Sequence, residues 1–129
     1  MMGLPVLPSY AMVMVKARFV GFHRWPEAPG EVAFLRDLHR HEFHVEVAME
    51  VEHDDRELEF FLVKNWLLAN PLKDLNLINH DGTDKRTNWS CEQMATYIGD
   101  QLREKYGNRY MQVGVYEDGE NGGVVVWRQ

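Results

Sequence analysis

The chain has 129 residues, of which 45% are hydrophobic and 26% charged, a composition that indicates one soluble globular domain spanning residues 1–129. Its net charge of −6, without a block of basic residues, argues against a nucleic-acid partner, because affinity for phosphate backbones comes from clustered Lys and Arg. The single cysteine rules out an intramolecular disulfide and fits a reducing, cytoplasmic compartment. The apolar start, Met1–Val15, is broken by Pro5 and Pro8 and has no basic region, so neither a signal peptide nor a membrane-spanning segment is expected.

Two strands are predicted in the first half of the chain, over residues 10–22 and 43–51, because apolar and polar side chains alternate there with a period of two. His39 and His41 precede the second strand and share the parity of its apolar residues. If the strand continues through them, their Cα atoms lie about 6.5–7 Å apart. His23 closes the first strand on its mostly apolar face. Three histidines at the covered ends of two strands fit a three-ligand metal site with an open fourth position. Ordinary histidines at strand ends would give the same pattern, so the residues alone leave both interpretations open.

A first amphipathic helix is predicted after the second strand, because four apolar residues fall on one helical stripe. The helix should end before Pro71, since the residue before a proline avoids the helical region. The following segment, residues 72–88, is polar and is predicted to be a loop. The stripe consists of Leu58, Phe61, Leu62 and Ala69.

A second helix is predicted to begin at Ser90, with Gln93 as the reciprocal partner of a capping box, and to end at Gly107. Alternation over residues 109–117 and a short apolar run over 124–127 predict a closing hairpin. The order strand, strand, helix, helix, strand, strand (ββααββ) indicates an α+β domain. We expect an antiparallel four-stranded sheet with two helices on one face.

Glu117 attracts attention because its parity places a carboxylate on the apolar face of the third strand, with Val113 and Val115. A charge in that position is costly without a partner. Such carboxylates commonly accept paired N–H donors from a ligand or from arginine. The alternative is that Glu117 lies just past the end of the strand and is solvated.

Five motifs, in order along nearly the whole chain, resemble the 6-pyruvoyl-tetrahydropterin synthase and 6-carboxy-tetrahydropterin synthase family, whose fold is called the T-fold. These motifs occupy residues 19–23, 39–43, 58–64, 90–95 and 116–118. The resemblance implies that His23, His39 and His41 carry zinc. It also implies that three subunits close their sheets into a barrel and that two barrels stack into a homohexamer, a dimer of trimers with its sites between subunits.

The resemblance further implies a site for a small ligand. Glu117 and Glu92, with the backbone around Ser90 and Cys91, would bind the amino-pyrimidinone edge of a pterin, whose neighbouring N–H donors match a carboxylate.

The sequence departs from the family at the positions that carry acid–base chemistry. The family's catalytic cysteine shortly before the zinc histidines has no counterpart in residues 34–38, where Asp37 is the nearest carboxylate. Lys73 and Asp74 stand where the family has an Asp-His pair. We therefore expect a protein that binds a pterin-like or related purine-derived ligand without the standard synthase activity. The alternatives are a zinc-dependent lyase acting on dihydroneopterin triphosphate or a related pterin, with Asp74, Lys73 or Asp37 moving protons, and a scaffold with neither ligand nor metal.

Overall fold

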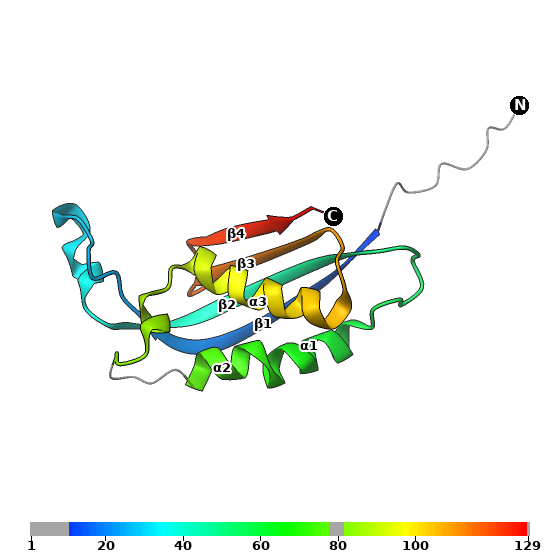
Figure 1. Cartoon of the computed structure of the whole chain (residues 1–129), viewed down its shortest axis with the longest axis horizontal. Helices are drawn as coiled ribbons and strands as arrows, with labels where there is room; N and C mark the ends of the chain where they lie inside the picture. The colour runs from blue at the N-terminus through cyan, green and yellow to red at the C-terminus, as the bar shows by residue number, and fades with distance from the viewer. Residues whose placement is uncertain (1–10, 78–81, 129) are drawn as a thin grey trace, which may run out of the picture.

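The computed structural model describes residues 11–77 and 82–128, so the predictions for the first ten residues lie outside the described part. In the described part, an antiparallel sheet in the order β1–β2–β3–β4 is covered on one face by helices (Figure 1). The predicted α+β arrangement is thus confirmed. The strands are β1 (Ala11–His23), β2 (His39–Val51), β3 (Met111–Glu117) and β4 (Gly122–Trp127); the α-helices are α1 (Phe60–Ala69), α2 (Pro71–Leu77) and α3 (Cys91–Tyr106). Two short 3-10 helices are η1 (Gly30–Arg36) and η2 (Lys85–Asn88).

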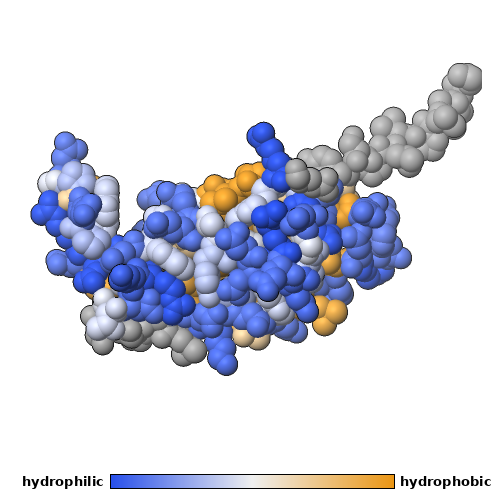
Figure 2. Space-filling model, viewed as in Figure 1, coloured by the Kyte–Doolittle hydropathy of each residue, from blue (hydrophilic) through white to orange (hydrophobic). Residues whose placement is uncertain are grey.

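The core lies between the sheet and the helices. Because side chains alternate along a strand, one parity of β1, β2 and β3 faces the helices and is buried. Against these strands pack Val63 and Leu67 of α1 and Met94, Ile98 and Leu102 of α3. The view in Figure 2 is mainly hydrophilic, with hydrophobic residues gathered along the β4 edge. In the described part of the chain, no helix combines the length and hydropathy needed to cross a membrane.

The first helix is present, but the predicted apolar stripe was wrong. Phe61 and Leu62 are 66% and 67% exposed, whereas Val63 and Leu67 are buried. The segment FFLVKNWLLA is apolar on several sides, so periodicity could not select the buried face. Packing against β1, together with the Glu59 carboxylate that accepts hydrogen bonds from the first turn, fixes the rotation of the helix instead.

The prediction of a loop over residues 72–88 was wrong for part of that segment. Pro71 begins a further helix, α2, rather than only ending α1. Proline is well tolerated at the first helical position, where its missing N–H has no partner to lose. Leu72 and Leu75 are buried, so this helix belongs to the core. The short helix η2 follows, with Asp84 capping its start.

The predictions for α3 and the closing hairpin are confirmed. Ser90 and Gln93 form both hydrogen bonds of a capping box, and Gly107 ends the helix. Strands β3 and β4 pair from Met111 with Trp127 to Tyr116 with Gly122. This pairing brings the β3–β4 turn to the same end of the sheet as the histidine ends of β1 and β2.

Candidate metal centre and ligand pocket

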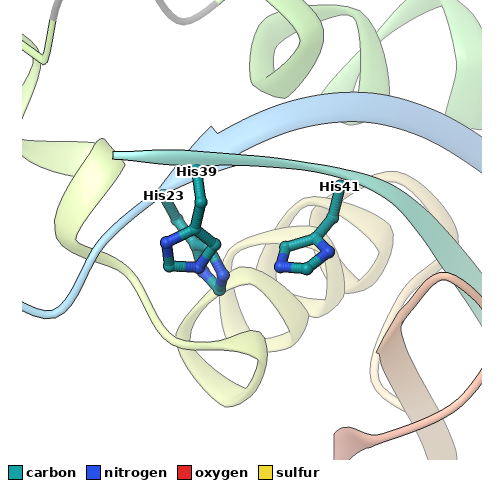
Figure 3. A group of neighbouring side chains, drawn as sticks. All are labelled: His23, His39 and His41. Atoms are coloured by element: carbon teal, nitrogen blue, oxygen red, sulfur yellow. The ribbon is translucent and has the colours of Figure 1, made fainter. Parts of the chain in front are cut away.

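The sheet register brings the three predicted histidines together at one end of β1 and β2. His23 pairs directly with His39, and His41 lies two residues further along β2. The ring centroids of His23 and His39 are 4.6 Å apart, those of His39 and His41 5.0 Å, and those of His23 and His41 5.6 Å. One ring nitrogen from each histidine lies within 4.8 Å of the other two, and the rings gather on one side of the strands (Figure 3). This grouping suits a shared metal ion.

Backbone carbonyls set the tautomers of two of these rings. His23 Nδ1 lies 3.0 Å from the carbonyl oxygen of Trp89, and His39 Nδ1 lies 2.8 Å from that of Asp37. A carbonyl oxygen only accepts hydrogen bonds, so Nδ1 carries a proton in both rings, and in the neutral form of each ring Nε2 presents a lone pair. Both Nε2 atoms are buried without a hydrogen-bond partner among the described residues. A metal ion can satisfy buried imidazole nitrogens that have no hydrogen-bond partner.

A carboxylate holds the third ring. His41 Nδ1 donates to Asp118 Oδ2 at 2.7 Å, and the other carboxylate oxygen accepts from the backbone N–H of Glu42 at 3.0 Å. These two hydrogen bonds, the one from His41 first, lower the pKa of Asp118 below its ordinary value. The carboxylate is therefore ionised at neutral pH and favours the Nδ1–H form of the imidazole.

The environment of His23 favours the neutral imidazole that metal binding requires. Its side chain is buried, and this burial is the main cause that lowers the pKa of His23 below its ordinary value. The hydrogen bond to Trp89 and the charge of Glu117 act in the opposite direction and raise this pKa, whereas the neighbouring His39 and His41 lower it further. A neutral imidazole can ligate a cation without first losing a proton.

Glu117 is the last residue of β3, and its carboxylate faces the histidines. Its Oε2 lies 2.9 Å from His41 Nε2, and its Oε1 lies 3.4 Å from His23 Nε2. The side chain is half-buried rather than freely solvated beyond the strand end. The two nitrogens of the His41 ring thus face two different carboxylates, Nδ1 that of Asp118 and Nε2 that of Glu117.

The predicted ligand-binding residues lie beside the histidines in a pocket of about 550 Å³. It is lined by the predicted residues Glu117, Glu92, Ser90, Cys91, His23 and His39, and by Arg24, Trp25, Leu35, Asn88, Trp89, Gln93, Asn121 and Gly122. Burial raises the pKa of the Cys91 thiol to about 12, and the carboxylates of Glu117 and Glu92 add to this effect. A thiol with that pKa is neither a base nor a nucleophile near pH 7.

Sequence reasoning missed three residues that line the pocket, the basic Arg24 and the aromatic Trp25 and Trp89. Arg24 donates from Nε to Asn88 Oδ1 and from Nη2 to the carbonyl of Gly82, which ties the end of β1 to the segment before α3. The positions of these three residues follow from contacts between loops, which leave no periodic signal. The one available signal was that Arg24 and Trp25 directly follow His23 in the sequence.

The three candidate acid–base residues lie outside this pocket. Within residues 11–77 and 82–128, Asp37, Lys73 and Asp74 are all exposed, and none of them lines it. Asp74 accepts a hydrogen bond from the hydroxyl of Tyr97 at 2.9 Å, which joins α2 to α3. Within the described residues, the proposed roles of Asp37, Lys73 and Asp74 in proton transfer therefore stay predictions.

The antiparallel sheet, the helices on one face and the three histidines at the strand ends together define a T-fold protein with a candidate three-histidine metal centre. Residues 12–128 match the family model described as 6-pyruvoyl tetrahydropterin synthase, and the chain belongs to this family. A search of curated proteins finds no match to the sequence.

Similar solved structures include 6-pyruvoyl tetrahydropterin synthase from Plasmodium falciparum, with a TM-score of 0.57 and 17% identity. A catalytic-residue mutant of the Plasmodium vivax enzyme has a TM-score of 0.57 and 18% identity. In both comparisons the match covers 95% of this chain and 100% of the other. At this level of identity the likeness concerns the fold.

Proposed function

We propose that this protein binds a pterin-like, or related purine-derived, small molecule in the pocket beside the histidines, without the standard synthase activity. The observation that carries the proposal is the half-buried carboxylate of Glu117, which lies in the pocket and within 2.9 Å of His41. An amino-pyrimidinone edge offers adjacent N–H donors that a carboxylate accepts in bidentate fashion. Glu92 lines the same pocket as a second acceptor, and Trp25 and Trp89 add aromatic surface to its lining, which suits a planar ring.

We propose that His23, His39 and His41 hold zinc through Nε2. The two buried nitrogens without hydrogen-bond partners support this assignment. A bound zinc would act as a Lewis acid toward oxygen atoms of the ligand side chain. The residues of the chain supply the geometry, since the carbonyls of Asp37 and Trp89 and the carboxylate of Asp118 orient the rings.

The lack of standard synthase activity follows from the missing acid–base groups. No thiol occurs in residues 34–38, and the only cysteine of the chain, Cys91, is buried with a pKa raised to about 12. Thiolate-mediated proton transfer is therefore unavailable near pH 7. The candidate residues Asp74 and Lys73 lie on α2 and do not line the pocket.

A zinc-dependent lyase acting on dihydroneopterin triphosphate or a related pterin is the second candidate. The intact three-histidine cluster favours it, because pterin binding alone does not require a metal centre. In this alternative Asp74, Lys73 or Asp37 moves protons. Asp74→Asn should then leave ligand affinity unchanged and eliminate turnover. Under either candidate function the protein assembles into a homohexamer with sites between subunits and acts in the cytoplasm.

The deciding experiment is elemental analysis of the purified protein, run with calorimetric titrations of neopterin and 7,8-dihydroneopterin triphosphate. Stoichiometric zinc with pterin binding and no turnover is the expected result. Glu117→Gln should weaken ligand binding more than about tenfold, since a hydrogen bond to a charged group contributes about 1.5–3 kcal/mol. Glu120→Gln removes an exposed carboxylate from the same hairpin, outside the pocket lining, and is the matched control. Wild-type protein without pterin affinity, or equal affinity in both variants, would refute the proposed role of Glu117.

A further inference from the structure

The turn between β3 and β4 reaches back to β2 beside the metal centre. Asp118 and Gly119 both have positive φ, 54° and 75°, and the N–H of Glu120 donates to the carbonyl of Glu117 at 2.9 Å. Consecutive residues with positive φ form the tight hairpin turn for which Asp-Gly is a preferred sequence. Turn formation alone would therefore explain an aspartate at this position. It does not explain where the carboxylate points.

The Asp118 carboxylate bridges two adjacent residues of β2. One oxygen accepts a hydrogen bond from Nδ1 of His41 at 2.7 Å, and the other accepts one from the backbone N–H of Glu42 at 3.0 Å. The backbone N–H of Asp118 donates in turn to the carbonyl of Glu42 at 2.8 Å. Three hydrogen bonds thus fasten the turn to the strand at and beside the histidine, which leaves the His41 ring little freedom to rotate.

The three histidines differ in how they are oriented. The carbonyls that accept from His23 and His39 belong to the backbone, so no side-chain substitution removes them. His41 is held by a side chain, and by one that carries charge. A carboxylate on the second nitrogen of a ligating imidazole fixes the tautomer and raises the basicity of the ring.

We propose that Asp118 is a positioning residue that orients His41 and strengthens its binding of the metal ion. This inference rests on the proposed metal centre and adds to it a residue that neither ligates the ion nor lines the ligand pocket. Asp118 would accept the hydrogen bond from Nδ1–H of His41 and so leave the Nε2 lone pair available to ligate the ion. Loss of such a partner typically costs about 10–100-fold in metal affinity.

Two variants test this role without disturbing the turn. Asp118→Asn keeps the shape and suits the left-handed conformation, but it removes the charge. Asp118→Gly suits positive φ even better and removes both side-chain hydrogen bonds. Glu120→Gln, which removes a carboxylate from the same turn, controls for the general loss of negative charge. Competition with a zinc chelator measures metal affinity, and thermal unfolding of the metal-free proteins measures fold integrity.

We expect affinity for zinc to fall about 10–100-fold in Asp118→Gly, less in Asp118→Asn, and not at all in Glu120→Gln. Imidazole nitrogen NMR of the metal-free proteins supplies a readout that a purely structural role would not change. The Nδ1–H signature of His41 should weaken in both Asp118 variants, whereas those of His23 and His39 should persist. Wild-type affinity in both Asp118 variants, or an equal loss in Glu120→Gln, would overturn the inference. Failure of the wild-type protein to bind zinc would instead reject the metal centre itself, so the two failures are distinguishable.

Discussion

Replacing Gly99 with alanine should destabilise the protein, because α3 meets the indole of Trp127 at this position. A Cβ atom on Gly99 would lie 2.0 Å from Cη2 of Trp127 and 2.5 Å from Cζ2. Carbon atoms normally approach to about 3.5–4.0 Å, so the indole has to move by roughly 1.5 Å or more. Trp127 ends the edge strand β4 and packs against the core from its rim. We therefore expect the indole to swing outward rather than the helix to shift.

Two opposing terms set the size of the effect. Alanine is favoured over glycine inside a helix by about 0.8–1.0 kcal/mol. Burial of a tryptophan removes about 150–250 Å² from water, and losing roughly half of that costs about 2–3 kcal/mol at about 25 cal/mol per Å². The packing loss wins, and Gly99→Ala should lower the free energy of unfolding by about 1–2 kcal/mol.

Urea unfolding followed by circular dichroism measures this difference. Gly30→Ala is the matched control, because no atom lies within 4 Å of a Cβ at that position. In a Trp127→Ala background the clash is absent, and Gly99→Ala should instead stabilise the protein by about 0.8–1.0 kcal/mol. The reasoning fails if Gly99→Ala alone leaves stability unchanged, or if it costs the same with and without the indole.

Three further predictions concern individual side chains. The thiol of Cys91, buried and with its pKa raised to about 12, should react with iodoacetamide at pH 8 only after unfolding in urea; fast reaction of the folded protein would contradict this. The backbone N–H of Glu52 and then Arg109 lower the pKa of Glu57 below its ordinary value of 4.5. Glu57→Gln should therefore be less stable than wild type at pH 7, and the difference should shrink as pH falls below that value; a difference that persists at low pH would exclude the carboxylate as its source. Ser90→Ala should cost about 1 kcal/mol in urea unfolding and Ser90→Gly only a few tenths, because Ser90 is the N-cap of α3.

The histidine cluster could be predicted because strand periodicity is local. Side chains two residues apart on a strand share a face, so His39 and His41 had to point the same way once β2 was identified. The antiparallel register then placed His23 beside them. The N-cap at Ser90 could also be predicted from the sequence, since a capping box depends on residues only three positions apart.

The face of α1 and the walls of the pocket could not be predicted in this way. The first helix carries apolar residues on several sides, and only its contact with β1 buries Val63 and Leu67 in place of Phe61 and Leu62. Hydrophobicity in the sequence does not distinguish apolar residues that face the core from those that face solvent.

By itself the sequence determined the α+β order, the strand parities and the identity of the three histidines, because each depends on the spacing of near neighbours. Only the tertiary structure decided that Asp118 holds His41, that Glu117 turns its carboxylate toward the histidines and that Trp25 and Trp89 line the same pocket. Those arrangements join residues far apart in the chain. Their geometry depends on the register of the sheet and on how the turn and the loops pack against it. Local periodicity carries no information about such contacts, which form only when the whole domain folds.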